Sequence, residues 1–336
     1  MFGAPRAAFV VALLVAGLVA GCGNTGGVTD QQSDLPGGPA SAPSGGPAPA
    51  GTVLVLDAPA TAVVVDPRTA AVAVALADPP RLLLSTLDGA APSREVPLPG
   101  PAADLGFAAE GGSVLVPVTV PPALIRVPLE GGATSRIDLD GSPRSAVVLG
   151  GRIVVALGDR LVVLDEDGAR RVVAGFADAS RLVPTGSKVA VLDRGRTAVS
   201  LVDPVSGEAG PALRAGNGAV EAVADRFGRM LVTDVHDGEL LIFAGDPLLM
   251  RQRWPVPGAP YGLAYDDQRD LAWLTLTARN EVVGFNVAGG EPVVMHRFPT
   301  VNQPDAVAVE PGSGRVVVAS ASGAGLQVID PERVVR

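Results

Sequence analysis

The sequence has little cysteine and little histidine. Its 336 residues contain one cysteine, Cys22, and two histidines, His236 and His296. A single cysteine excludes a disulfide within the chain, and so few Cys and His ligands argue against a structural zinc site. The sequence also lacks a G-x-S-x-G motif and a Gly-rich phosphate loop opening a helix. These absences leave no recognisable catalytic motif.

The sequence also lacks long apolar runs beyond residue 21 and any long stretch of helical periodicity. The mean hydropathy of +0.35 comes from Ala and Val spread over many short runs, none near the roughly 18 unbroken apolar residues of a spanning helix. Basic residues are outnumbered, with a net charge of −9 and a pI near 4.8. Because such a surface repels phosphate backbones, we expect no nucleic-acid partner.

The N-terminus has the pattern of a secretory signal. Residues 1–6 carry one positive charge, and Ala7–Val19 is an uninterrupted apolar run. The run ends in Val-Ala-Gly-Cys, which resembles the lipobox of bacterial lipoproteins. The resemblance implies removal of residues 1–21, lipidation of Cys22 and attachment to the outer, extracytoplasmic face of the cell membrane. The alternative is an uncleaved anchor helix, for which the run is short, since a span needs about 20 residues.

Residues 22–51 predict a tether. They include PGGPASAPSGGPAPAG, which has almost no large apolar side chain. A segment of this composition cannot fold by burying apolar surface. We therefore expect a disordered spacer that packs against nothing.

From Thr52 onward the sequence is periodic. Pro59, Pro101 and Pro143 recur about 42 residues apart, and short Val-rich runs alternate with Gly, Pro and Asp turns. Periods near 40 with four short strands are typical of β-propeller blades. Each unit has a recognisable second strand, and there are seven of them: 71–77, 113–120, 152–157, 188–192, 229–233, 271–277 and 315–320.

The ends of the array predict how the ring closes. The last unit has little room for a fourth strand before Arg336, and the run Thr52–Ala58 has no partner in the first unit. Pairing this run with Leu326–Ile329 would remove a free sheet edge; the alternative is a loose N-terminal strand. The sequence thus predicts an all-β fold, a seven-bladed β-propeller over residues 52–336 closed by an N-terminal strand.

Two resemblances support this fold. Asp225–Gly245, DRFGRMLVTDVHDGELLIFAG, resembles an NHL repeat, and the array as a whole resembles the YVTN-type seven-bladed propellers of bacterial surface and periplasmic proteins. The chain departs from the YVTN signature, where it has VVVAS at Val316–Ser320 and WLTLT at Trp273–Thr277. The resemblance implies a fold and not a function.

Polar loop residues concentrate in the later units. In a propeller, the loops between second and third strands share one mouth with the loops between blades, and recognition residues concentrate on such loops. The candidates for binding a partner or ligand there are His236, Asp237, Tyr261, Arg279, Asn280, Asn302 and Gln303. The alternative is that these are ordinary solvated turns, and for His236-Asp237 a polar turn is favoured over acid–base chemistry.

We therefore predict a non-catalytic, membrane-anchored scaffold. The expected partner is an envelope protein or a small ligand, and neither a cofactor, a metal nor a catalytic residue is assigned. The alternative is a divalent-cation-dependent hydrolase or lactonase, because gluconolactonase-type propellers coordinate a cation in the channel. Glu221 and Asp104 would be the candidate ligands in that case.

Overall fold

The computed structural model describes residues 1–3, 37–87, 93–108 and 112–333. The chain divides into two units, Met1–Gln32 and Ser33–Arg336, and the features below belong to the second. The predicted signal peptide and Cys22 lie outside the described residues. No helix in the described part of the chain is long and apolar enough to span a membrane.

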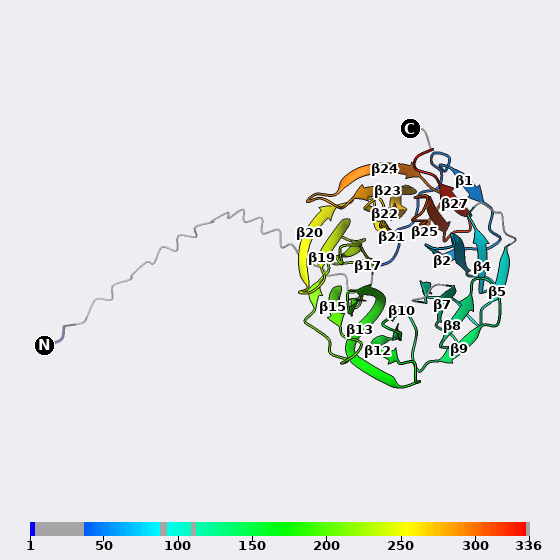
Figure 1. Ribbon diagram of the computed structural model, residues 1–336. Coiled ribbons are helices and arrows are strands. Elements are labelled where there is room, and N and C mark those ends of the chain that lie inside the picture. The colour runs from blue at the N-terminus through cyan, green and yellow to red at the C-terminus, as the bar shows by residue number, and fades with distance from the viewer. Residues whose placement is uncertain (4–36, 88–92, 109–111, 334–336) are drawn as a thin grey trace. The chain divides into compact units, whose positions relative to one another are not determined.

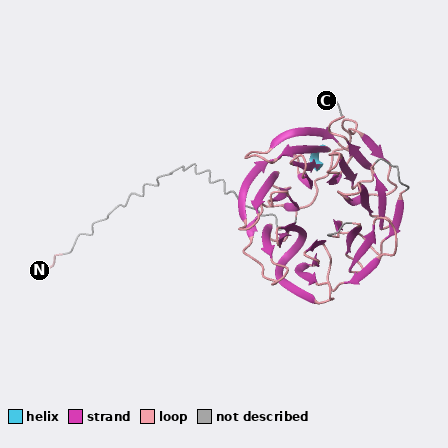
Figure 2. Cartoon of the chain, viewed as in Figure 1, coloured by secondary structure: helices cyan, strands magenta, loops and turns pink. Residues whose placement is uncertain are grey.

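Strands make up nearly all of the regular structure (Figure 2), and neighbouring strands pair antiparallel. The first two sheets have four strands each. The first contains β2 (Ala60–Val65), β3 (Ala71–Leu76), β4 (Arg81–Thr86) and β5 (Arg94–Pro97). The second contains β6 (Gly106–Phe107), β7 (Ser113–Val118), β8 (Ala123–Pro128) and β9 (Ser135–Asp138).

The third sheet has seven strands because one long strand, β13 (Arg170–Thr185), belongs to two successive groups of four strands. It contains β10 (Ser145–Leu149), β11 (Arg152–Ala156), β12 (Gly158–Leu164), β13 (Arg170–Thr185), β14 (Lys188–Asp193), β15 (Ala198–Val202) and β16 (Leu213–Arg214). The first part of β13 pairs with β12 and its last part with β14. One extended strand thus ends one group of four strands and begins the next.

Three further four-stranded sheets follow. They contain β17 (Ala219–Ala224), β18 (Met230–Asp234), β19 (Glu239–Ala244) and β20 (Leu249–Pro255); then β21 (Pro260–Asp266), β22 (Leu271–Leu276), β23 (Glu281–Asn286) and β24 (Val293–Pro299); and finally β25 (Pro304–Val309), β26 (Val316–Ser320), β27 (Leu326–Ile329) and β1 (Thr52–Leu54). A 3-10 turn, η1 (Thr277–Arg279), joins β22 to β23.

The sheets of this unit are arranged in a ring, with the first strand of each toward the centre (Figure 1). Apolar clusters fill the spaces between neighbouring sheets; one joins Val72 and Val74 to Val317 and Ala319. Second strands are therefore covered on both sides, and every residue of β22 is buried. Outer strands such as β20 are largely exposed.

The ring closes as the sequence predicts. Thr52, Val53 and Leu54 pair antiparallel with Val328, Gln327 and Leu326. The pairing covers only the first three residues of the predicted run; beyond them Leu56 and Ala58 pack into the cluster between the first and last sheets. A loose N-terminal strand is excluded.

The predicted disorder of the tether is wrong for its second half. Residues 37–50, which we call the strap, have no helix or strand but follow a defined path, shown in blue in Figure 1 between β17 and β25. Gly37 is buried, and seven hydrogen bonds described below join the strap to loops and to the strands β24 and β27. The composition of this segment shows only that it buries little apolar surface, whereas hydrogen bonds to its backbone hold it in place.

Candidate functional site

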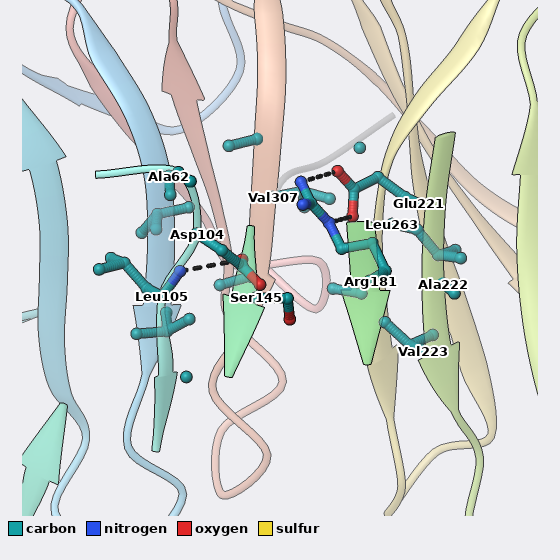
Figure 3. Close-up of a pocket in the computed structure, with 18 of the residues that line it drawn as sticks. Ala62, Asp104, Leu105, Ser145, Arg181, Glu221, Ala222, Val223, Leu263 and Val307 are labelled. Carbon is teal, nitrogen blue, oxygen red and sulfur yellow. Dashed lines mark hydrogen bonds and ion pairs between the residues drawn. The ribbon is translucent and has the colours of Figure 1, made fainter. Parts of the chain in front are cut away.

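The first strands of the sheets surround a central cavity of about 720 Å³. Small and apolar residues of the first strands line part of its wall, among them Ala62, Ala222, Leu263 and Val307 (Figure 3). Charged side chains also line it, among them Asp104, Arg181 and Glu221. A cavity of this size has the dimensions of a small-molecule site.

An ion pair projects into the cavity between β13 and β17. The guanidinium of Arg181 donates two hydrogen bonds to the carboxylate of Glu221, each 2.5 Å long (Figure 3). Each side chain is only 18% exposed. Burial would lower the pKa of Arg181, but the nearby charges of Glu221 and Asp104 more than offset this, and its pKa is raised. The pair is therefore charged and mutually satisfied.

Asp104 and Ser145 lie across the cavity from this pair (Figure 3). Burial raises the pKa of Asp104; Arg181 partly offsets the shift, and Glu221 adds to it. The carboxyl accepts a hydrogen bond from the backbone N–H of Leu105, 2.9 Å long. It thus sits in the environment that favours a protonated acid.

Two titratable groups lie near the mouth of the cavity. Burial raises the pKa of Asp305 to about 6, although hydrogen bonds from Gln303 and Thr277 lower it in part. Burial likewise raises the pKa of the Tyr261 phenol. Asp305 therefore changes charge near neutral pH, and Tyr261 stays neutral there.

Three side-chain amides, Asn280, Asn302 and Gln303, form what we call the amide cluster. The Asn280 oxygen accepts from the backbone N–H of Gln303 at 3.1 Å, and the Asn302 oxygen accepts from the hydroxyl of Ser322 at 3.0 Å. Since these bonds orient the two amides, their NH₂ groups are presented to the strap.

The backbone at the cluster supports this arrangement. Asn280 and Gln303 have φ angles of +51° and +53°. Asn adopts this left-handed region readily, but Gln does so at a cost. The Gln303 side chain offsets the strain with three hydrogen bonds, of which Nε2 donates one to Asp305 at 2.9 Å.

The cluster binds the backbone of the strap. Gln303 Nε2 donates to the carbonyl of Ala40 at 2.9 Å, and Gln303 Oε1 accepts from the N–H of Ala42 at 3.0 Å. Asn280 and Asn302 both donate to the carbonyl of Pro43, each at 3.0 Å.

The two ends of the strap are fixed separately. Arg194, which also lines the cavity, donates to the carbonyl of Gly37. At the other end, the N–H of Ala50 donates to Pro299 and its carbonyl accepts from Gln327 at 2.7 Å.

A tight seat fixes the register of the strap at Gly37. A Cβ there would approach the carbonyl oxygen of Gly218 to 2.8 Å and methyl groups of Val220 and Val235 to 2.9 Å. Next to it, a Cβ on Gly38 would meet nothing within 4 Å. The strap therefore requires glycine at one position and not at its neighbour.

The His236-Asp237 pair lies in a polar turn, as favoured from the sequence. The buried carboxylate of Asp234 organises this turn by accepting hydrogen bonds from the N–H groups of His236 and Asp237. Asp237 itself accepts from the Asn217 amide at 3.0 Å and lies 3.4 Å from Arg253. The Asp237 carboxylate is thereby engaged in the fold of the turn.

The described residues contain one group of three clustered acidic or imidazole side chains, Asp234, Asp237 and Glu239. None of them lines the central cavity. The sequence suggested Asp104 and Glu221 as cation ligands in the cavity. Both carboxylate oxygens of Glu221 instead accept hydrogen bonds from Arg181. These residues do not fit a divalent cation in the channel.

The structure thus brings Asn280, Asn302 and Gln303 together and places Tyr261 in the cavity wall. Arg279, the last residue of η1, directly precedes Asn280 and is exposed. Sequence reasoning missed Arg181 and Asp305. A signal for Arg181 was present in the sequence, because Arg181 precedes Glu221 by 40 residues, about one repeat.

No family model matches the chain, and no curated protein matches its sequence. Solved structures do match. Hydrazine synthase of Kuenenia stuttgartiensis is 13% identical with a TM-score of 0.70, over 85% of this chain and 99% of that one. A streptogramin B lyase is 12% identical with a TM-score of 0.70, over 82% and 96%. A catalytically inactive virginiamycin B lyase from Staphylococcus aureus with quinupristin is 13% identical with a TM-score of 0.69, over 82% and 97%. The likeness shows the fold, a β-propeller.

Proposed function

We propose that this chain is an exported lipoprotein whose seven-bladed propeller binds a partner without catalysing a reaction. The count of seven follows if β13 is read as the outer strand of one blade and the inner strand of the next, so that the seven-stranded sheet is two blades. The NHL- and YVTN-like spacing of the repeats supports the same count.

The anchor proposed is Cys22, lipidated after removal of residues 1–21 and holding the propeller at the extracytoplasmic face of the membrane. The support is the apolar run followed by Val-Ala-Gly-Cys. We expect Cys22→Ser to move the protein from the membrane fraction to the soluble one or to leave it unprocessed. Unchanged mass and unchanged membrane association in this variant would rule out the anchor.

The binding surface proposed is the mouth formed by Arg194, Tyr261, Arg279 and the amide cluster. The observation that carries this proposal is the orientation of the amides: neighbouring loops hold their oxygens, and their NH₂ groups donate to backbone carbonyls outside the sheets. Oriented donors on rigid strands are typical of recognition surfaces. The partner proposed is an envelope protein.

The alternative, a divalent-cation-dependent hydrolase or lactonase, has less support. The cavity carboxylates are not grouped as cation ligands, and the Arg181–Glu221 pair is already satisfied. The similar solved structures include lyases and a synthase. At 12–13% identity, they carry no activity over to this chain.

Affinity capture tests the binding role. The lipidated chain is used as bait in detergent-solubilised envelope, beside the variants Arg279→Ala and Asn302→Ala. We expect both to lose at least half of the specifically captured partner while their melting temperatures stay within a few degrees. The matched controls are Asp167→Ala and Gly290→Ala, in turns between third and fourth strands. If capture survives the first pair and fails with the second, the binding face is the opposite one.

A further inference from the structure

The strap is already bound at this mouth in the manner of a peptide ligand. The carbonyls accepting hydrogen bonds from Arg194, Gln303 and the two asparagines belong to Gly37, Ala40 and Pro43, spaced three residues apart. A polyproline II helix has three residues per turn, so it presents every third carbonyl on one side. The sequence PGGPASAP suits that conformation, because proline favours it.

We propose that the mouth recognises an extended, proline- and small-residue-rich segment of a partner protein, and that the strap occupies this site in cis. This rests on the proposed binding role of the mouth and names the partner's chemistry. The segment needs glycine at its first contact, because the Gly37 seat has no room for a Cβ. It needs free carbonyls three and six residues later, where the amide cluster donates.

The strap is suited to being displaced. Nearly all of its residues between Gly38 and Pro49 are exposed or only half-buried. Its attachment therefore comes from hydrogen bonds to backbone atoms, with little apolar burial. A partner segment offering the same carbonyls replaces these bonds one for one, leaving the sheets unchanged. Covalent linkage gives the strap an effective concentration on the order of millimolar, so it competes with a weak partner and yields to a tight one.

The test uses a labelled 14-residue peptide with the sequence of residues 37–50, titrated against the full detergent-solubilised chain. Three proteins are compared: wild type, a variant lacking residues 37–49, and that variant with Gln303→Ala. We expect saturable binding to the strap-deleted chain, about tenfold weaker binding to wild type, and loss of binding with Gln303→Ala. Where the deletion fails to fold, Gly37→Val in the full chain takes its place and Gly38→Val is its control.

Two control peptides set the specificity: a shuffled sequence, and one with valine in place of the first glycine. Both are expected to bind the strap-deleted chain at least tenfold more weakly than the native peptide. Equal binding of native and shuffled peptides, or equal binding to wild type and strap-deleted chain, overturns the inference. The affinity capture can also be repeated in the presence of the native peptide. If capture of a partner depends on Arg279 and Asn302 but the peptide does not reduce it, this inference is wrong and the proposed function stands. If the peptide binds as expected but no captured partner depends on Arg279 and Asn302, the proposed function is wrong and this inference stands.

Discussion

The strap and the strand that follows it are adjacent in sequence but attached in different ways. The strand β1 has three exposed residues joined to β27 by a regular backbone ladder. The strap has no regular structure, and its carbonyls accept hydrogen bonds from side chains of loops. A ladder completes a sheet, so its loss leaves an unpaired edge. Side-chain donors can instead turn to water or to another peptide when the strap leaves.

The comparison predicts the largest loss of stability for the closing segment. Deleting residues 52–58 removes the β1 ladder and the packing of Leu56 and Ala58, and takes Asp57 away from the buried guanidinium of Arg81. Because Arg81 keeps its ion pair with Glu95 and Asp57 is mostly exposed, this last loss adds only about 1 kcal/mol to that of the ladder and the packing. We expect a loss of at least about 4 kcal/mol and association through the open edge, measured by thermal unfolding and light scattering. Replacing the exposed Pro47 and Ala48 with serine, which keeps the length of the strap, should barely change the melting temperature. If this variant and the deletion melt alike, β1 does not close the ring.

A smaller effect is expected for Gly37→Val, which removes the strap from its seat. The new side chain collides with Gly218, Val220 and Val235, so the strap loses its register. Losing several partly exposed hydrogen bonds should cost about 1–3 kcal/mol, a few degrees in melting temperature. Hydrogen exchange of the Ala42 amide, bonded to Gln303, should accelerate at least tenfold. Gly38→Val is the matched control, since its Cβ meets nothing; equal effects from both would show that the seat does not hold the strap.

The smallest expected effect is a pH dependence from Asp305, beneath the strap. Its folded pKa of about 6 lies above the ordinary value of 3.8, so the folded chain binds an extra proton between these pH values. The free energy of unfolding therefore falls as pH rises from about 4 to about 6 and is flat above. Because Asp305 is partly exposed, we expect a modest effect. Between pH 4 and 7, the free energy of unfolding of wild type should fall by about 1 kcal/mol relative to that of Asp305→Asn. Denaturant unfolding across this range tests it; parallel curves would show that Asp305 keeps its ordinary pKa.

The regular part of the fold could be predicted because it repeats. Each of the second strands expected from the sequence is a strand in the structure, from β3 to β26. The continuous strand β13 was not foreseen, because Gly175 was compatible with a turn between two strands. Periodicity reports which residues are buried, but not whether a chain bends between them.

The site could be predicted only in part, for a related reason. Asn280, Asn302 and Gln303 were expected at one mouth, since both sets of loops end there. The strap was missed because none of its side chains carries the recognition. Its carbonyls do, and every residue has one. The sequence shows this site only through the glycine at residue 37. One glycine among 42 does not identify a binding site.

Under the proposal that Cys22 is lipidated, the seat at Gly37 also sets how far the propeller can move from the membrane. With lipid at Cys22, the chain between anchor and seat is about 15 residues, which span at most about 50 Å fully extended. Once the strap is released, the free chain extends from Cys22 to Gly51. Its maximum length roughly doubles, to about 100 Å. The volume that the propeller can search then grows about eightfold. Exchanging the strap for a partner segment would therefore also decide how far from the membrane the partner is held.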